Sequence, residues 1–387
     1  MKRIQVTSFG PLQEADISFG DMTVFVGEQA SGKSILLQLV KLVLDAGDIN
    51  RTLKTHGYGL GKDSGSFLSR YFGEGMEGVW HCDTRVAVDG MAFSLDDVLS
   101  KKGPKKKESL FLIPAHRVLT LREGWPRAFM DYVPGYPYVV RQFSEHLRRL
   151  METGLGTGKD AIFPQAGRMN KILRDGIEKS IFGDAQVRLD TSLNDLPRRI
   201  VLDVANGPRL PLMAWSAGQR EFLPLLLGLY WLMPSGRSPK RKGVDWVVIE
   251  EPEIGLHAQA ISFLLLVFLE LLQRGYRVIV STHSPQFLEW LWAIRVIATE
   301  RTVPEKRLLK LLDLPPNPFS KKLVETGLEK AFSTYYFSRQ KSLVTVKDIS
   351  TLDPGDVDTD VSDWGGLTLF GTRVSEWLTA AIEEENS

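Results

Sequence analysis

Continuous apolar runs of strand length recur along this chain, and stretches with the spacing of buried helices lie between them. Runs of this kind, ended by glycine, proline or acidic residues, are typical of strands that are buried on both faces of a largely parallel sheet. Such strands are expected at residues 23–26, 110–113, 246–249 and 278–280. The clearest helices are expected at residues 34–40, 219–233 and 258–274. The pattern therefore predicts an α/β fold.

Two antiparallel hairpins interrupt this alternation. An Asp-Gly pair at residues 89–90 and an Asn-Gly pair at residues 206–207 each separate two runs with strand character. Both pairs suit the positive φ angles of tight hairpin turns. We therefore expect hairpins at residues 85–93 and 199–214.

Breaks in the pattern predict four segments. They are a first lobe with an antiparallel β subdomain at residues 1–117, a helical insertion at 118–190, a second lobe at 191–300 and a C-terminal extension at 301–387. No internal repeat and no sustained heptad pattern is present, so a long coiled coil is not expected.

Composition narrows the classes of function. The net charge of this chain of 387 residues is only +1, so no global attraction to nucleic acid or to an acidic membrane is expected. Cys82 is the single cysteine, which excludes a disulfide within the chain and a cysteine-based zinc site. The most apolar stretch, residues 261–272, is shorter than the roughly 20 residues that cross a bilayer. With no signal-peptide pattern in the first residues, a cytoplasmic protein without a membrane partner is expected.

The segment from Gly27 to Ser34 matches the G-x-x-x-x-G-K-[ST] pattern of a phosphate-binding loop. Its glycines let successive backbone N–H groups converge on phosphate at the N-terminus of the following helix. Lys33 is expected to reach the β- and γ-phosphates, and the Ser34 hydroxyl to ligate Mg²⁺. A chance match in a glycine-rich loop is the alternative. The expected nucleotide-binding residues here are Gly27, Glu28, Gln29, Ala30, Ser31, Gly32, Lys33 and Ser34.

Acidic residues come directly after the apolar strand at residues 246–249. In a parallel sheet such a strand end opens beside the phosphate-binding loop. We assign the metal role to Glu250 and the role of catalytic base to Glu251, which would orient or deprotonate the attacking water. Glu250 stands where most phosphate-loop ATPases have aspartate, and its side chain is longer by one methylene. The alternative is a pair of solvated acids that cap a helix.

Three further motifs follow in a telling order: WSAGQRE at residues 215–221, EIGLH at 253–257 and STHSPQ at 281–286. Together with IQVTSFGPLQEADISFGDMTVFVGEQASGKS at residues 4–34 and VVIEEP at 247–252, they make the chain resemble the ABC-type ATPases. The resemblance is to the soluble SMC/RecF-like and OLD-like branch, often described as AAA family ATPases. It covers most of residues 1–290.

The resemblance implies a phosphate-loop NTPase fold of ABC type, with a mixed central sheet, helices on both faces, an antiparallel β subdomain and a helical insertion. It also implies ATP and Mg²⁺ as cofactors. His283 matches the switch histidine that senses the γ-phosphate or holds the attacking water; a satisfied core histidine is the alternative. The residues that match the signature motif, which contacts ATP bound to the opposite subunit, are Ser216, Ala217, Gly218 and Gln219. The matched motifs thus imply an ATP-sandwich homodimer or a higher even oligomer, with residues 255–257 at its seam.

One departure from the family pattern concerns Arg117. The family has a glutamine loop where this chain has Pro-Ala-His-Arg at residues 114–117, which is similar to a Pro-Ala-x-Arg segment in OLD-like relatives. Arg117 would contact phosphate or the partner chain, or form a surface salt bridge.

Three functions suit an ATPase that forms such an ATP-sandwich dimer. The first is a sensor or scaffold that acts with a separate effector protein in a prokaryotic defence-type system, as the resemblance implies. The second is a DNA repair or genome-maintenance ATPase of SMC/RecF type, with nucleic acid bound by basic loops at residues 101–107 and 240–242. The third is the nucleotide-binding subunit of an ABC transporter. The alternative for the basic loops, which we prefer, is that they are ordinary solvated loops.

A nuclease activity is the main rival class of enzyme, because OLD-like nucleases carry a Toprim domain after the ATPase. The candidate metal-binding residues are Asp356, Asp358 and Asp360. They follow a Pro-Gly turn, whereas the Toprim acids follow an apolar strand. We therefore interpret this cluster as a solvated acidic loop without a metal.

Overall fold

The structure is a computed structural model that describes residues 1–58, 63–99, 107–153, 155, 161–165, 167–190, 198–235 and 239–385. The chain divides into two compact units. Unit 1 comprises residues 1–33, 83–92 and 281–387, and unit 2 comprises residues 34–82 and 93–280. These boundaries differ from the four consecutive segments expected from the sequence, because each unit collects segments that lie far apart along the chain.

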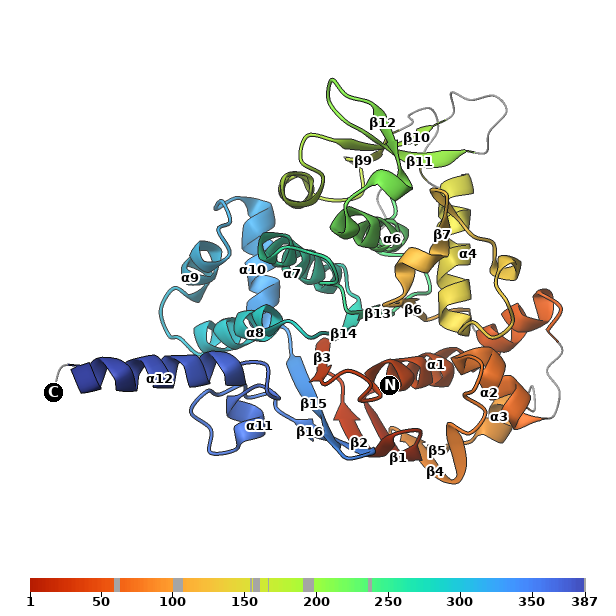
Figure 1. The fold of residues 1–387 in the computed structure, drawn as a ribbon, viewed down its shortest axis with the longest axis horizontal. Helices are drawn as coiled ribbons and strands as arrows, with labels where there is room; N and C mark the ends of the chain where they lie inside the picture. Colours follow the sequence, from red (N-terminus) through yellow and green to blue (C-terminus); the bar gives the residue numbers. More distant parts are fainter. Residues whose placement is uncertain are drawn as a thin grey trace. The chain divides into compact units, whose positions relative to one another are not determined.

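Unit 1 is built on a mixed sheet (Figure 1). Its strands follow the order β5 (Met91–Phe93), β4 (Trp80–Val88), β1 (Arg3–Phe9), β2 (Leu12–Ser18), β16 (Leu343–Asp348), β15 (Phe332–Gln340) and β3 (Met22–Gly27). β1 pairs with β2 and β15 with β16 in antiparallel fashion, whereas β15 lies parallel to β3 and β16 parallel to β2. The expected hairpin at residues 85–93 is present, with Asp89 at a φ of 50° and Gly90 at 81°.

The C-terminal segment supplies two inner strands of this sheet, β16 and β15, which lie between β2 and β3. β15 runs beside β3 in register from Phe332 opposite Met22 to Phe337 opposite Gly27. The Phe337 and Phe25 rings lie 5.1 Å apart in the core. Residues 301–387 are therefore an integral part of unit 1, although the sequence predicted an extension. Strand pairing between residues so distant in sequence has no local signal.

The helices described in unit 1 lie in its C-terminal segment, residues 281–387. They are α8 (Pro285–Ala298), α9 (Pro304–Leu311), α10 (Pro318–Glu329), α11 (Thr359–Ser362) and α12 (Leu369–Glu385). α8, α9 and α10 pack against one another. α12 extends away from α11 (Figure 1), and each of its described side chains is exposed. None of the described helices is both long and apolar enough to span a membrane.

Unit 2 contains a short run of core strands and the longest of the described helices, α1. The strand order is β14 (Arg277–Ser281), β13 (Trp246–Glu250) and β6 (Leu110–Ile113), with β13 and β6 parallel. The helices are α1 (Lys33–Thr55), α2 (Ser64–Phe72), α3 (Leu95–Leu99), α4 (Tyr138–Thr153), α5 (Lys171–Ile177), α6 (Ala217–Leu232) and α7 (Ala258–Gln273). The predicted α/β fold with a mixed sheet is confirmed.

Unit 2 also contains a second sheet, of which the sequence predicted only the β11–β12 hairpin. It is antiparallel, in the order β12 (Arg209–Pro211), β11 (Arg199–Asp203), β10 (Gln186–Asp190) and β9 (Ala161–Phe163). β11 and β12 form the predicted hairpin, with Asn206 at a φ of 58°. The expected helical insertion at 118–190 contains α4 and α5, but it also contributes β9, β10 and the small hairpin of β7 (Leu121–Arg122) and β8 (Trp125–Pro126). Strands of two to five residues are too short to show a periodic pattern.

Buried charges fix the start of β6 in unit 2. α1 is kinked at Asp45, whose φ of −125° is not helical. The Asp45 carboxylate accepts hydrogen bonds from the backbone N–H groups of Ser109 and Leu110 at 2.8 and 3.0 Å. Lys41, which is 1% exposed, donates to Asp45 at 2.8 Å and to Glu108 at 2.7 Å. The pairs compensate each buried charge locally.

Candidate functional site

The phosphate-binding loop of unit 1 has the backbone that its glycines allow. Gly27, Ala30 and Gly32 have φ values of 143°, 58° and 85°. A Cβ atom on Gly27 would lie 2.7 Å from the carbonyl oxygen of Phe337 in β15. Only glycine fits this approach, so the neighbouring strand as well as the loop turn requires Gly27.

The Lys33 side chain forms hydrogen bonds with groups of the phosphate-binding loop itself. Its side chain is nearly buried, at 5% exposure. The Nζ atom donates to the carbonyl oxygens of Gly27 and Glu28, both at 2.8 Å, and to Oγ of Ser31 at 3.2 Å. The ammonium group is thus held inside the ring of the loop, while Glu28, Gln29 and Ala30 are exposed. A fixed cation at a helix N-terminus provides a site for an anion.

Ser34 and Glu250 come together in unit 2. Glu250 ends β13 and is 4% exposed. Burial raises the pKa of Glu250 to about 7, and the charge of Glu251 adds to this rise. The N–H of Ala115, which donates to Oε2 at 3.0 Å, the hydroxyl of Ser34 and the charge of Arg117 oppose the rise in pKa.

The other oxygen of Glu250, Oε1, is buried and has no hydrogen-bond partner within the part of the chain that the structure describes. A buried carboxylate oxygen without a partner is unfavourable. Hard divalent cations prefer carboxylate and hydroxyl oxygens. The Glu250 carboxylate beside the Ser34 hydroxyl therefore fits the Mg²⁺ ion that the sequence implies.

Glu251 has a strained backbone. Its φ of 43° lies in the left-handed region, which a residue with a side chain seldom adopts. Strain of this kind persists only where the surrounding structure enforces it, and it is frequent at functional sites. The side chain is half-buried, so it remains accessible to water.

Arg117 requires a correction. Its side chain is completely buried, and its guanidinium donates to the backbone carbonyls of Glu221, Glu250 and Glu251 at 3.1, 3.0 and 3.1 Å. It does not reach the surface, so the expected surface salt bridge is wrong, whereas the expected contact with phosphate or with the partner chain stays a prediction. Arg117 instead ties the N-terminal part of α6 to the end of β13.

The signature motif begins α6 with a capping box. Ser216 Oγ accepts from the Gln219 N–H at 3.3 Å, and Gln219 Oε1 accepts from the Ser216 N–H at 3.1 Å. This reciprocal arrangement is a standard helix start. Ala217 and Gly218 form the first turn, so their N–H groups point outward along the helix axis.

Gly218 touches the segment expected at the dimer seam. A Cβ atom on Gly218 would lie 2.4 Å from the carbonyl oxygen of Gly255, and one on Gly255 would lie 3.2 Å from the Cα of Gly218. Gly255 also has a φ of 72°. Two motifs separated by the whole of β13 therefore meet backbone to backbone within unit 2.

His283 belongs to unit 1 and follows β14. The preceding Thr282 donates its N–H to the carbonyl of Phe25 in β3 at 3.0 Å. Thr282 Oγ1 accepts from the Ser284 N–H at 3.0 Å. This anchoring places the half-buried His283 in a segment attached to the strand that leads into the phosphate-binding loop.

Ala115 is a site residue that the sequence analysis missed. Its N–H reaches Glu250 because β6 and β13 are parallel neighbours, with Ile113 opposite Ile249. The available signal was the end of the predicted strand at residue 113, two residues before Ala115. Phe337, which forces glycine at position 27, had no local signal at all.

The remaining charged candidates have mainly structural partners. Lys347 donates to Asp358 at 2.7 Å and to Asp360 at 2.8 Å, and the described residues contain no cluster of three or more His, Cys, Asp or Glu side chains that could hold a metal ion. Lys240 pairs with Asp245 at 2.7 Å, and the Arg241 guanidinium lies 3.6 Å from the centre of the Trp231 ring. Of the other expected basic loop, residues 101–106 lie outside the described residues.

Comparison with known families gives a match over residues 166–289, to the model described as "AAA domain, putative AbiEii toxin, Type IV TA system". The matched segment contains the signature motif, the carboxylate strand and the histidine segment, and it does not include the phosphate-binding loop. It supports the predicted class of phosphate-loop ATPase, whereas the narrower OLD-like branch is not confirmed. No curated protein sequence matches this chain.

Among solved structures, the chain is similar to an SMC head bound to the C-terminal winged-helix domain of ScpA, with 11% identity, coverage of 90% of this chain and 96% of that one, and a TM-score of 0.41. It is similar to the SMC head domain from Thermotoga maritima, with 12% identity, coverage of 90% and 98%, and a TM-score of 0.32. It is also similar to cbiO1 from Clostridium perfringens, part of the ABC transporter complex cbiONQ, with 12% identity, coverage of 73% and 78%, and a TM-score of 0.31.

Proposed function

We propose that this chain binds and hydrolyses Mg-ATP, and that nucleotide closes two copies head to tail around two ATP molecules. The observation that supports this most directly is the Ser34–Glu250 pair, in which a buried carboxylate oxygen without a partner lies beside a hydroxyl at the start of α1. This is the donor set that a nucleotide-bound Mg²⁺ uses in phosphate-loop enzymes.

Each proposed residue has one role. Ser34 and Glu250 hold Mg²⁺, which when bound neutralises charge on the triphosphate. Lys33 exchanges loop carbonyls for phosphate oxygens, as its three hydrogen-bond acceptors within the loop suggest. Glu251 orients the attacking water, and His283 senses the γ-phosphate.

The signature helix acts on the partner copy in this proposal. Ser216, Gly218 and the first N–H groups of α6 cap the ATP that is bound to the other subunit. The close contact between Gly218 and Gly255 supports a shared role, because it joins the signature turn to the segment expected at the dimer seam. Release of phosphate would then open the dimer.

We further propose that the switch acts as a sensor or scaffold for a separate effector protein in a prokaryotic defence-type system. The family description, which names a putative toxin of a Type IV toxin–antitoxin system, is consistent with a protein that works as one member of a pair.

The test replaces Glu251 with glutamine in the full chain. Glu251→Gln should bind Mg-ATP with unchanged affinity, hydrolyse it at least about 100-fold more slowly, and accumulate as a dimer. ATP affinity, turnover and mass in solution report the three effects. Lys33→Ala is the paired variant: it should lose about tenfold or more in ATP affinity and stay monomeric with ATP. The control is Lys171→Ala, an exposed lysine of α5.

Two outcomes would contradict the proposal. If Lys33→Ala binds ATP as tightly as the wild type, the loop does not hold the triphosphate. If Glu251→Gln remains monomeric with saturating Mg-ATP, the head-to-tail dimer is wrong even though nucleotide binding stands.

A further inference from the structure

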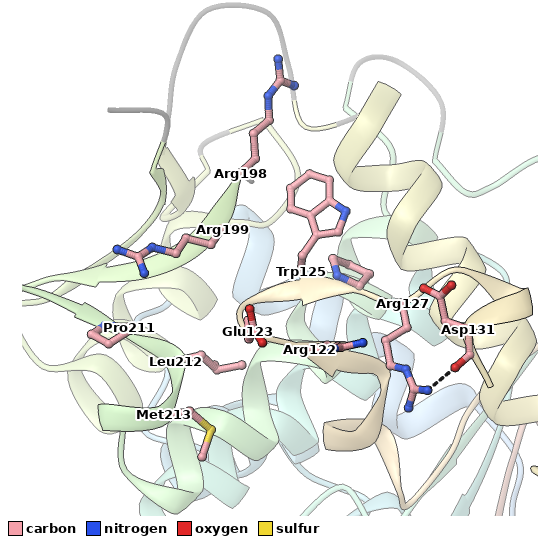
Figure 2. Close-up of a pocket in the computed structure, with 11 residues that line it drawn as sticks. Arg122, Glu123, Trp125, Arg127, Asp131, Arg198, Arg199, Pro211, Leu212 and Met213 are labelled. Atoms are coloured by element: carbon pink, nitrogen blue, oxygen red, sulfur yellow. Dashed lines mark hydrogen bonds between the residues drawn. The ribbon is translucent and has the colours of Figure 1, made fainter. Parts of the chain in front are cut away.

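An open cavity of about 690 Å³ lies in unit 2, and none of its lining residues belongs to the proposed nucleotide site (Figure 2). Its walls are the β7–β8 hairpin, the start of β11, and the short segment between β12 and α6. The lining residues are Arg122, Glu123, Trp125, Pro126, Arg127, Asp131, Arg198, Arg199, Pro211, Leu212 and Met213. Nothing in the proposed ATPase mechanism uses them.

The hairpin is fixed against the second sheet by a glycine. Glu123 and Gly124 form the turn, with φ values of 52° and 83°. The Ile200 N–H donates to the Gly124 carbonyl at 2.8 Å, and a Cβ atom on Gly124 would lie 2.8 Å from the Ile200 oxygen. This contact sets Trp125 beside Arg198, and Figure 2 shows both side chains extending in the same direction.

The cavity carries an excess of positive charge. Four arginines line it, against only two acidic side chains. Arg127 is already engaged, because it donates to the Asp131 carbonyl and lies 3.9 Å from the centre of the Tyr132 ring. Arg199 is 3.6 Å from Asp190. Arg122 and Arg198, by contrast, make no ion pair with any residue that the structure describes.

The rest of the lining is apolar. Trp125, Pro126 and Leu212 form much of it, and Met213 is 75% exposed. Met130 and Val133, on either side of Asp131, are 55% and 61% exposed. Tryptophan, methionine and arginine are the residues enriched at protein interfaces, whereas exposed apolar side chains in a group are unusual on a free surface.

Both walls of the cavity are close in sequence to residues at or beside the proposed nucleotide site. Arg122 comes five residues after Arg117, whose guanidinium holds the carbonyls of Glu250 and Glu251. On the other wall, Met213 comes three residues before Ser216, the cap of the signature helix. An occupant that touches both walls contacts the two segments that lead to the carboxylate strand and to the signature motif.

We propose that this cavity docks an acidic segment of a partner protein, with a bulky apolar side chain on Trp125 and Met213 and with carboxylates on Arg122, Arg198 and Arg199. The inference deepens the proposed function, on which its role as an effector contact rests. Arginine pairs with carboxylates in a planar two-bond geometry. Glu123 and Asp131 would repel a continuous phosphate backbone, whereas a peptide can place its carboxylates away from them, so a protein segment is favoured over a nucleic acid.

The test is a selection of random 12-residue displayed peptides on the immobilised full chain. Peptides recovered on the wild type should be enriched in Asp and Glu around one aromatic or long aliphatic residue. One recovered peptide, labelled and titrated by fluorescence anisotropy, should bind Arg198→Glu/Arg199→Glu at least about tenfold more weakly, and Trp125→Ala also more weakly. The matched control is Lys171→Glu/Lys179→Glu, which makes the same charge change at two exposed lysines of unit 2 outside the cavity.

Several results would overturn this proposal. They are a selection without acidic enrichment, equal binding to the cavity and control variants, or a labelled 12-nucleotide poly-dT probe that binds in place of the peptide and is lost with the cavity variants. ATP affinity, measured in the same preparations, should be unchanged in Arg198→Glu/Arg199→Glu. A wild type that binds peptide but no ATP would refute the proposed function and leave the docking site standing.

Discussion

Glu251 combines a proposed chemical role with an unfavourable backbone, and the two effects can be separated at the level of one residue. Its φ of 43° costs a residue with a Cβ atom roughly 1 kcal/mol, which glycine does not lose. We expect Glu251→Gly to be about 1 kcal/mol more stable towards urea than Glu251→Ala, while both variants fail to hydrolyse ATP. Equal stability of the two variants would show that the turn is not strained.

The residue scale also shows what motifs alone can predict. Lys33, Ser34, Glu250 and Gly218 could be singled out because the motifs that contain them are defined by neighbours in the sequence. The surroundings of Arg117 could not be predicted, because its three acceptors belong to α6 and to the end of β13. Hydrogen bonds from a buried arginine to backbone carbonyls cannot be predicted from the neighbouring sequence, because every residue has a carbonyl group.

At the scale of elements, the start of β6 depends on charges that respond to acid. Burial alone would raise the pKa of Glu108, but His146, at 2.9 Å, and Lys41 lower it to about 2. A lowered pKa stabilises the fold fully above the ordinary value of 4.5 and loses that effect as the pH falls towards 2. The free energy of unfolding should therefore drop across that interval, by about 3 kcal/mol from this group.

Glu108→Gln is the variant that checks this origin. It should be less stable than the wild type at pH 7, and its unfolding free energy should vary less between pH 4.5 and pH 2, as measured by urea titration at each pH. Glu305→Gln, an exposed glutamate of α9, serves as the control. An identical acid profile in the wild type and in Glu108→Gln would assign the acid sensitivity to other groups.

Core strands and long helices were predictable at this scale, because each carries its own apolar run. The short strands β7 to β10 were not, since two to five residues show no period and their stability comes from distant partners. The hairpin of β11 and β12 was the exception, because the Asn-Gly pair at residues 206–207 marks its turn without any tertiary context.

At the scale of the whole molecule, the C-terminal segment divides into an essential and a dispensable part. A chain that ends at Lys330 lacks β15 and β16, which lie between β3 and β2, and leaves both edges unpaired. We expect this truncation to be insoluble or unfolded. A chain that ends at Thr368 lacks only α12, whose described side chains are all exposed, and should melt within about 3 °C of the full chain. Circular dichroism melting of both chains decides the matter, and a folded shorter chain would contradict the sheet order.

The pairing of β3 with β15 also governs when the protein becomes competent during its synthesis. β3 leaves the ribosome among the first residues, yet its parallel neighbour follows more than 300 residues later. At 5–20 residues per second the interval is roughly 15–60 seconds. Throughout that time the flank of β3 that will pair with β15 has no ladder partner, so the growing chain exposes an unpaired strand edge that is prone to aggregation.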